Sequence, residues 1–185
     1  MGHRVLVAYD RDGYDLHYAH WGLAPDDITP ATPFGGPPDD GWAADRAADL
    51  LDAHGGRLTE NDDRAVNPDP IATGLTFAEV CQRVDPLEHE ALFVVAPDFA
   101  VRTYLVFPIE RDNGRPTRAL VGYDGRQDAA YLRGWLAGAR AVRDTSGLDG
   151  PAVARALRWL DADRGTVVWL AEGTPSTAMA DERDA

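Results

Sequence analysis

The sequence predicts an α+β fold, with an antiparallel sheet of about six strands and helices packed on one face. Two observations favour it. Short runs rich in Val, Leu and Tyr are joined by turn-forming residues, and other segments have apolar residues at helical spacing. Hydrophobic residues make up 44% of the 185 residues. We therefore expect one domain over residues 1–171 and a polar C-terminal tail over residues 172–185.

The first two strands are predicted at residues 3–10 and 14–21, joined as a hairpin across Arg11-Asp12-Gly13. The length of the hairpin loop decides which side chains share a face. A loop of two or four residues places His3, Tyr18 and His20 together. A loop of three residues groups His3 with His17 and Trp21 instead, so both groupings stay open.

A long loop is predicted next, at residues 22–41, because its five prolines and paired glycines prevent helix or strand from continuing. Loops of this length tend to be lids, binding loops or disordered segments. An amphipathic helix is predicted at residues 42–54. A second helix is predicted from Thr76 to about Val84, because Thr76 and Glu79 match the capping-box pattern.

The sequence of the C-terminal half predicts three further strands that form a meander, one isolated strand and two helices. The meander strands are predicted at residues 91–96, 101–109 and 117–123, and the last strand at residues 166–170. One helix covers residues 127–143, where apolar residues recur at helical spacing. Asp149 is positioned to cap the other helix.

The charge composition indicates a salt-adapted cytoplasmic protein. All 18 basic residues are arginine, acidic residues number 31, and the net charge is −13. Self-repulsion of this size is screened at high salt. The absence of lysine excludes Schiff-base chemistry, lysine-linked pyridoxal phosphate and a phosphate-binding loop with its lysine, and we expect no cofactor. No apolar run reaches the length of a membrane span, so we expect no membrane partner.

The single cysteine, Cys81, excludes an internal disulfide, and we expect it to be a buried thiol. The residues on either side of Cys81 are predicted to form a helix. No catalytic nucleophile is indicated by this residue.

Histidine and aromatic residues gather on the first hairpin beside the long loop. The ligand-binding candidates are His3, His17, Tyr18, His20 and Trp21. One interpretation is that His3 and His20 form a metal-binding or acid–base pair, since imidazole titrates near neutrality and binds divalent metals. The other, which we favour, is that the imidazoles are hydrogen-bonded members of an aromatic sheet face. No third metal ligand is identifiable, so no metal site is assigned.

Arginine is concentrated between residues 115 and 164, where the local balance is +3. Arg126, Arg133 and Arg140 recur every seven residues and align along one helix face, which makes them anion-binding candidates. Trp135 or Trp159 could add stacking contacts. The simpler interpretation is an amphipathic helix whose polar face uses arginine.

Two N-terminal segments, MGHRVLVAY at residues 1–9 and LHYAHWG at residues 16–22, resemble the start of a small family of haloarchaeal proteins of unknown function. The resemblance implies a salt-adapted cytoplasmic origin. It brings no activity, cofactor or catalytic residue.

These observations predict a binding or regulatory module for an unknown small molecule or protein, with the hairpin and the loop at residues 22–41 as its surface. A metal-dependent hydrolase using His3 and His20 is the alternative. Nucleic-acid binding through the arginine-bearing helices is a third hypothesis.

Overall fold

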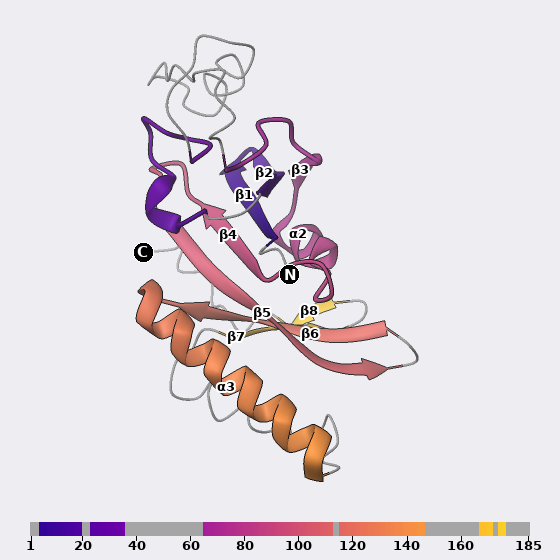
Figure 1. Ribbon diagram of the computed structural model, residues 1–185. Helices are drawn as coiled ribbons and strands as arrows, with labels where there is room; N and C mark the ends of the chain where they lie inside the picture. The colour runs from indigo at the N-terminus through magenta and orange to yellow at the C-terminus, as the bar shows by residue number, and fades with distance from the viewer. Residues whose placement is uncertain are drawn as a thin grey trace, which may run out of the picture. The chain divides into compact units, whose positions relative to one another are not determined.

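The computed structural model describes residues 4–19, 23–35, 65–112, 115–146, 167–171 and 174–176, which form an α+β fold (Figure 1). The chain divides into two compact units, Met1–Thr103 and Tyr104–Ala185, which are described separately below. None of the described helices is long and apolar enough to cross a membrane.

The sheet of the first unit is mixed, with the strand order β3-β2-β1-β4. Strands β1 (Val5–Arg11) and β2 (Gly13–Ala19) form the predicted antiparallel hairpin, and β3 (Ala72–Leu75) pairs antiparallel with β2. Strand β4 (Ala91–Val95) runs parallel to β1. The prediction of a purely antiparallel sheet is therefore wrong for this pair. The chain returns through β3 and a helix before it enters β4, and such a crossover produces parallel pairing.

Helix α2 (Phe77–Arg83) begins at the predicted capping box. The Thr76 hydroxyl accepts a hydrogen bond from the Glu79 N–H at 3.3 Å, and the Glu79 carboxylate accepts one from the Thr76 N–H at 2.8 Å. Both bonds satisfy N–H groups that a helix start would leave unpaired. The ring of Phe77 lies 6.0 Å from that of Tyr14, so the start of α2 packs beside β2. Cys81 is a buried thiol, as predicted.

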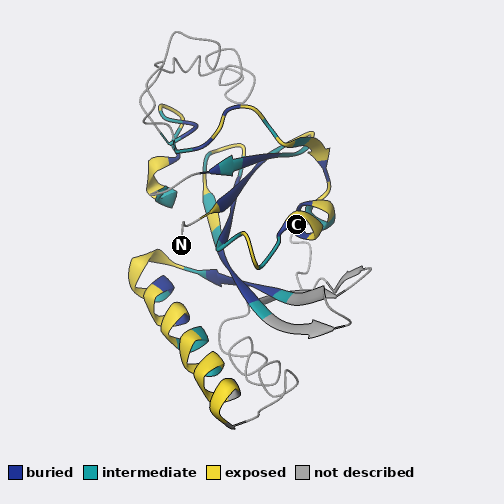
Figure 2. Cartoon of the chain, turned by 45° about the vertical axis from the view of Figure 1, so that its right-hand side comes forward, coloured by how far each residue is buried: buried dark blue, intermediate teal, exposed yellow. Residues whose placement is uncertain are grey.

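The core of the first unit lies in its central strands (Figure 2). All five residues of β4 are buried. A continuous apolar run of this kind is typical of a strand covered on both faces. Strand β1 is buried over its first five residues, and both strands therefore provide a rigid base for the segments that pack on them.

Strand β5 (Val101–Asp112) starts in the first unit and continues into the second, where the strand order is β5-β6-β7-β8. Strand β6 (Arg115–Tyr123) pairs antiparallel with β7 (Val167–Ala171), and β7 pairs antiparallel with β8 (Thr174–Ser176). The strands predicted from residues 101, 117 and 166 are confirmed. Strands β3 and β8 were not predicted, and β8 lies within the expected C-terminal tail.

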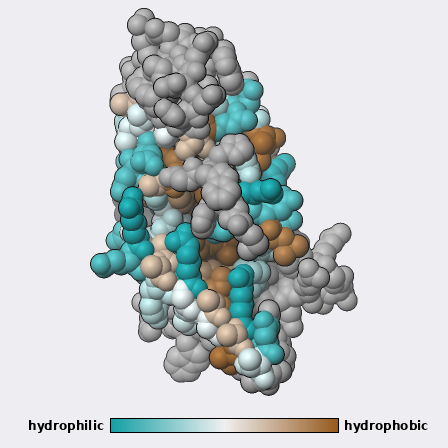
Figure 3. Space-filling view, viewed as in Figure 1, coloured by the Kyte–Doolittle hydropathy of each residue, from teal (hydrophilic) through white to brown (hydrophobic). Residues whose placement is uncertain are grey.

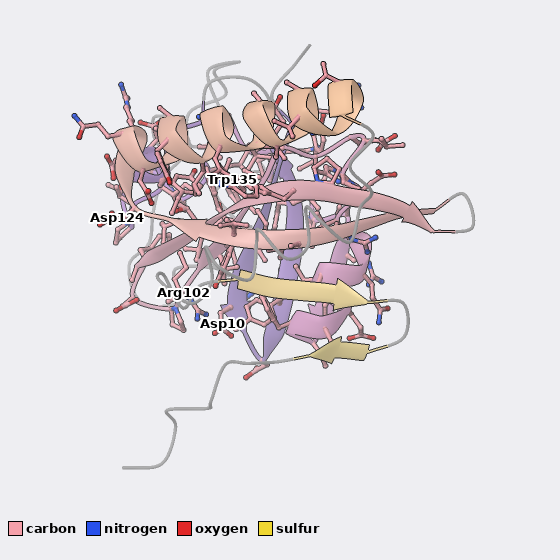
Figure 4. The ribbon with its side chains drawn as sticks, turned by 90° about the horizontal axis from the view of Figure 1, so that it is seen from below. Asp10, Arg102, Asp124 and Trp135 are labelled. Carbon is pink, nitrogen blue, oxygen red and sulfur yellow. The ribbon has the colours of Figure 1, made fainter. Side chains whose placement is uncertain are left out.

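Helix α3 (Gly125–Ser146) confirms the helix predicted at residues 127–143. Ala129 and Leu132 are buried, and the ring of Trp135 stacks on that of Phe107 of β5 at a centroid distance of 5.9 Å. Trp135 lies between α3 and the strands (Figure 4). The rest of the helix surface is mostly exposed (Figure 2). Because α2 and α3 lie in different units, their packing on one common face stays a prediction.

Two predicted helices, at residues 42–54 and after Asp149, lie outside the described residues.

Candidate functional site

The hairpin has the register of a three-residue loop. Val7 lies opposite His17 and Tyr9 lies opposite Asp15, while Arg11 and Gly13 flank the tip. The registers of a two-residue or four-residue loop are therefore wrong. Residues opposite each other in a sheet project to the same face, so His17 shares its face with Val7 and Tyr9.

His17 lies in the core of the first unit, with 2% of its surface exposed. Its Nδ1 atom lies 2.8 Å from the backbone carbonyl oxygen of Asn67. Because a carbonyl oxygen only accepts, Nδ1 carries the proton and donates. The imidazole meets the ring of Tyr9 edge-on at 5.1 Å and lies 5.7 Å from the ring of Phe34. We call Tyr9, His17 and Phe34 the aromatic cluster.

The other two members of the aromatic cluster are also buried. The hydroxyl of Tyr9 donates a hydrogen bond to the carbonyl oxygen of Pro33. Burial raises the pKa of Tyr9 far above its ordinary value, because the ionised phenolate would lose its hydration. The rings of Tyr9 and Phe34 lie 5.9 Å apart in an edge-on arrangement. Tyr9 is therefore a neutral hydrogen-bond donor that fixes the chain at Pro33.

Backbone hydrogen bonds hold a second segment against the same hairpin. The N–H of Asn67 donates to the carbonyl oxygen of Tyr18 at 2.8 Å, and the N–H of Ile71 donates to that of Leu16 at 2.7 Å. The N–H of Val66 donates to the carbonyl oxygen of Phe34 at 3.0 Å. Residues 23–35 and 65–71, which we call the two stems, are thus joined to the hairpin and to each other.

The first stem is the described part of the predicted long loop, and it has local hydrogen-bonded structure. It contains a short 3-10 helix at Pro25–Asp27 and a bridge between Thr29 and Thr32, whose hydroxyl groups lie 2.8 Å apart. Ile28 and Phe34 are buried. The predicted loop therefore packs on the hairpin over this part, while residues 36–41 lie outside the described residues.

The structure separates the predicted ligand-binding residues. His17 is buried on the face of the aromatic cluster, whereas Tyr18 is half-buried on the opposite face, across from Leu6. His3, His20 and Trp21 lie outside the described residues. In the part of the chain that the structure describes, no group of three or more His, Cys, Asp or Glu side chains is placed to hold a metal ion.

Sequence reasoning missed three residues of this arrangement: Tyr9, Phe34 and Asn67. Phe34 carried a usable signal, because it is the single aromatic residue in the proline-rich stretch at residues 22–41. Large aromatic side chains contribute much of the apolar burial that anchors a segment. Asn67 carried no such signal, because it contributes only a backbone carbonyl oxygen.

The three predicted anion-binding residues lie on one helix. Arg126, Arg133 and Arg140 are exposed on α3. Trp135 is half-buried on the side of α3 that meets the strands (Figure 4). The helical repeat puts the three arginines on the other side of α3, so Trp135 is directed away from these arginines. Trp159 lies outside the described residues.

Comparison with known proteins gives a family but no activity. The model of a family of unknown function matches residues 1–168, which include every described strand of the first unit. No curated protein and no solved structure matches the chain.

Proposed function

Because the chain belongs to this family of unknown function (DUF6735), we propose its function from the geometry of the first unit. We propose that the protein is a binding or regulatory module. Its ligand or partner surface is formed by the hairpin β1–β2 together with the first stem, residues 23–35. The observation that carries the proposal is the aromatic cluster, which fixes the stem on the hairpin.

A fixed stem favours binding for a physical reason. A loop that is already held in position loses less conformational entropy when a ligand binds, so more of the contact energy appears as affinity. Binding residues are also disproportionately found on loops that a rigid scaffold positions. In this role His17 and Tyr9 are positioning residues, because both are buried beneath the stem.

Of the two ligand-binding candidates that the structure describes, His17 lies in the core, which leaves Tyr18 as the contact residue. Tyr18 belongs to the sheet face opposite the aromatic cluster, so it represents the hairpin part of the proposed surface and not the part formed by the first stem. It is half-buried, and its backbone carbonyl oxygen accepts the hydrogen bond from Asn67 of the second stem. A tyrosine at such a position offers an apolar ring and a polar hydroxyl group, which suits contact with a small molecule or a protein.

Tyr14 provides a matched control for Tyr18. Both are half-buried tyrosines of β2 on the same sheet face, but Tyr14 lies beside Phe77 of α2. Wild type, Tyr18→Ala and Tyr14→Ala are screened by thermal shift against nucleotides and carboxylates in high salt. We expect one ligand class to raise the Tm of wild type and Tyr14→Ala but not that of Tyr18→Ala. Equal shifts in all three proteins would show that this face of the hairpin is not part of the ligand surface.

We also propose that this module works in a salt-rich haloarchaeal cytoplasm. The support is the composition, 31 acidic residues against 18 arginines without lysine, and the resemblance of its N-terminal segments. Screening of the net charge of −13 should stabilise the folded chain. Unfolding followed by circular dichroism should show a Tm that rises with KCl concentration, and a Tm independent of KCl would contradict the proposal.

The metal-dependent hydrolase needs a separate test, because His3 and His20 lie outside the described residues. Protein purified in high salt without chelator is analysed for bound metal, and its Tm is measured with added Zn²⁺ or Mn²⁺. Stoichiometric metal that is lost in His20→Ala, together with a Tm rise in wild type, would establish the metal site that the hydrolase requires and would favour the hydrolase over the binding module. Trace metal and an unchanged Tm would support the module.

A further inference from the structure

Helix α3 carries three exposed arginines in a nearly straight row. Arg126, Arg133 and Arg140 are seven residues apart, so each is turned by only about 20° from the one before it. A helix rises 1.5 Å per residue, which puts about 10.5 Å between neighbouring arginines and about 21 Å between the first and the last. We call these three residues the arginine row.

The spaces between the arginines are filled by alanine. Ala130 and Ala137 lie on the same side of α3 and are exposed. Hydrophilic surface alternates with paler surface along α3 in the space-filling view (Figure 3). Small side chains between the arginines leave the guanidinium groups open to a partner that approaches along the helix.

Carboxylates that could neutralise the arginine row within α3 are few. Arg126 and Arg133 have no Asp or Glu three or four residues away in the sequence, which are the positions where helix side chains meet. Arg140 has Asp144 four residues later. The other aspartate of the helix, Asp128, accepts a hydrogen bond from the Asp124 N–H at 2.9 Å. In a chain with 31 acidic residues, this arrangement is a local exception.

The side chains on this side of α3 indicate which class of partner the arginine row can bind. Protein interfaces need an apolar centre with large anchoring side chains, and this side of α3 offers only alanine methyl groups between the arginines. Single-stranded nucleic acid is bound largely by stacking on aromatic rings. The exposed aromatic residue of α3, Tyr131, lies about 160° around the helix axis from Arg133. A dense anion that needs neither apolar burial nor stacking fits best.

We propose that the arginine row binds the phosphate backbone of a nucleic-acid duplex without sequence preference. A duplex carries about one negative charge per 1.7 Å of its axis, and guanidinium groups match phosphate oxygens with two parallel hydrogen bonds. No base-reading side chain stands between the arginines, so the contacts are with the backbone alone. This proposal rests on the second unit and is independent of the surface proposed for the hairpin.

Fluorescence anisotropy of a labelled DNA duplex, measured over a series of KCl concentrations, tests the proposal. Each arginine that contacts a phosphate adds about one to the negative slope of log K against log salt concentration. We expect Arg133→Ala to reduce the slope by about one and to weaken binding about tenfold at the lowest salt that keeps the protein folded. Arg140→Ala should behave alike.

Arg83→Ala is the matched control, because Arg83 is an exposed arginine on the other described α-helix. It should leave affinity and slope unchanged. Arg133→Lys should keep most of the slope but not the full affinity, because lysine cannot form the paired hydrogen bonds. Circular dichroism confirms that each variant is folded.

Three outcomes would overturn the proposal. In the first, the protein does not bind the duplex at any salt concentration at which it is folded. In the second, Arg133→Ala and Arg140→Ala both bind the duplex with the affinity and salt dependence of Arg83→Ala. In the third outcome, a single strand or polyglutamate binds as tightly as the duplex, which assigns the row to another partner.

Discussion

The imidazole of His17 donates a hydrogen bond to the backbone carbonyl oxygen of Asn67, a residue 50 positions later in the chain. The same ring contacts Tyr9 and Phe34, so one side chain joins the hairpin to both stems. The proposed surface therefore depends on a group that is itself buried. Its polar contact and its packing contribute separately to stability, and substitutions can separate them.

The first prediction concerns the separate contributions of the hydrogen bond and the packing of His17 to stability. His17→Phe keeps an aromatic ring but leaves the Asn67 carbonyl oxygen without its donor, which should cost about 1–3 kcal/mol. His17→Ala also opens a cavity between Tyr9 and Phe34, so its cost should be larger, roughly 3–5 kcal/mol. Urea unfolding at constant KCl, followed by circular dichroism, measures both. Equal stability of His17→Phe and wild type would show that the hydrogen bond contributes nothing.

The second prediction concerns Tyr9. Tyr9→Phe removes the donor to the Pro33 carbonyl oxygen and should cost about 1–3 kcal/mol. Because burial raises the pKa of Tyr9 above its ordinary value of 10.0, the folded state favours the neutral phenol. The stability linked to Tyr9 is thus fully present below pH 10 and decreases as the pH rises above it.

Comparison with Tyr9→Phe isolates this pH dependence from that of the other tyrosines. Wild type should lose stability more steeply than the variant above pH 10, in urea unfolding at a fixed KCl concentration. Parallel curves for the two proteins would mean that Tyr9 ionises as readily in the folded state as in the unfolded chain.

Local sequence signals predicted both α-helices that the structure describes, α2 and α3, but not the short 3-10 helix at Pro25–Asp27. The Thr76 and Glu79 capping box acts within one helical turn, and its bonds are those that the pattern predicts. Apolar spacing likewise identified α3, since Ala129 and Leu132 need only the helical repeat to share a face. In both cases the interactions that determine the structure lie within a few residues.

The hairpin register could not be predicted, because it depends on distant contacts. Asp12-Gly13 suits a two-residue turn, but Gly13 lies against Gly74 of β3, which joins the other edge of β2. The parallel pairing of β1 with β4 depends on residues more than 80 positions apart. The candidate site likewise depends on distant contacts. The sequence pattern identified His17 as a candidate, but not the backbone carbonyl oxygen of Asn67 that accepts its hydrogen bond.

The third prediction concerns two glycines at positive φ. Gly13 has φ +127°, and a Cβ there would lie 2.9 Å from the carbonyl carbon of Gly74. Gly74 has φ +66°, and a Cβ there would meet nothing within 4 Å. Gly74→Ala should cost only the backbone strain, about 1–2 kcal/mol. Gly13→Ala should cost more, because backbone atoms of β3 must also move.

Gly134 of α3 is the control for these substitutions, since a Cβ there meets nothing within 4 Å and no positive φ is involved. Gly134→Ala should stabilise the protein by up to about 1 kcal/mol through helix propensity. Urea unfolding should therefore rank the variants Gly134→Ala, Gly74→Ala and Gly13→Ala in order of falling stability. A Gly13→Ala protein as stable as Gly74→Ala would contradict the close approach of β3.

The last prediction concerns His89, in the turn between α2 and β4. Its Nδ1 atom accepts a hydrogen bond from the Asp85 N–H at 2.9 Å, so protonation of Nδ1 would remove this bond. Burial lowers the pKa of His89 below its ordinary value of 6.5, and the Arg4 charge acts in the same direction, while Glu88 and Asp85 oppose it. A lowered pKa means that the folded state favours the neutral ring. The stability linked to His89 is therefore fully present above pH 6.5 and is lost as the pH falls through the lowered value.

His89→Asn offers an acceptor that does not titrate. The difference in unfolding free energy between wild type and this variant should therefore shift against wild type below pH 6.5. A difference that stays constant over that range, or an NMR titration giving His89 a pKa above 6.5, would show that the ring is not held neutral.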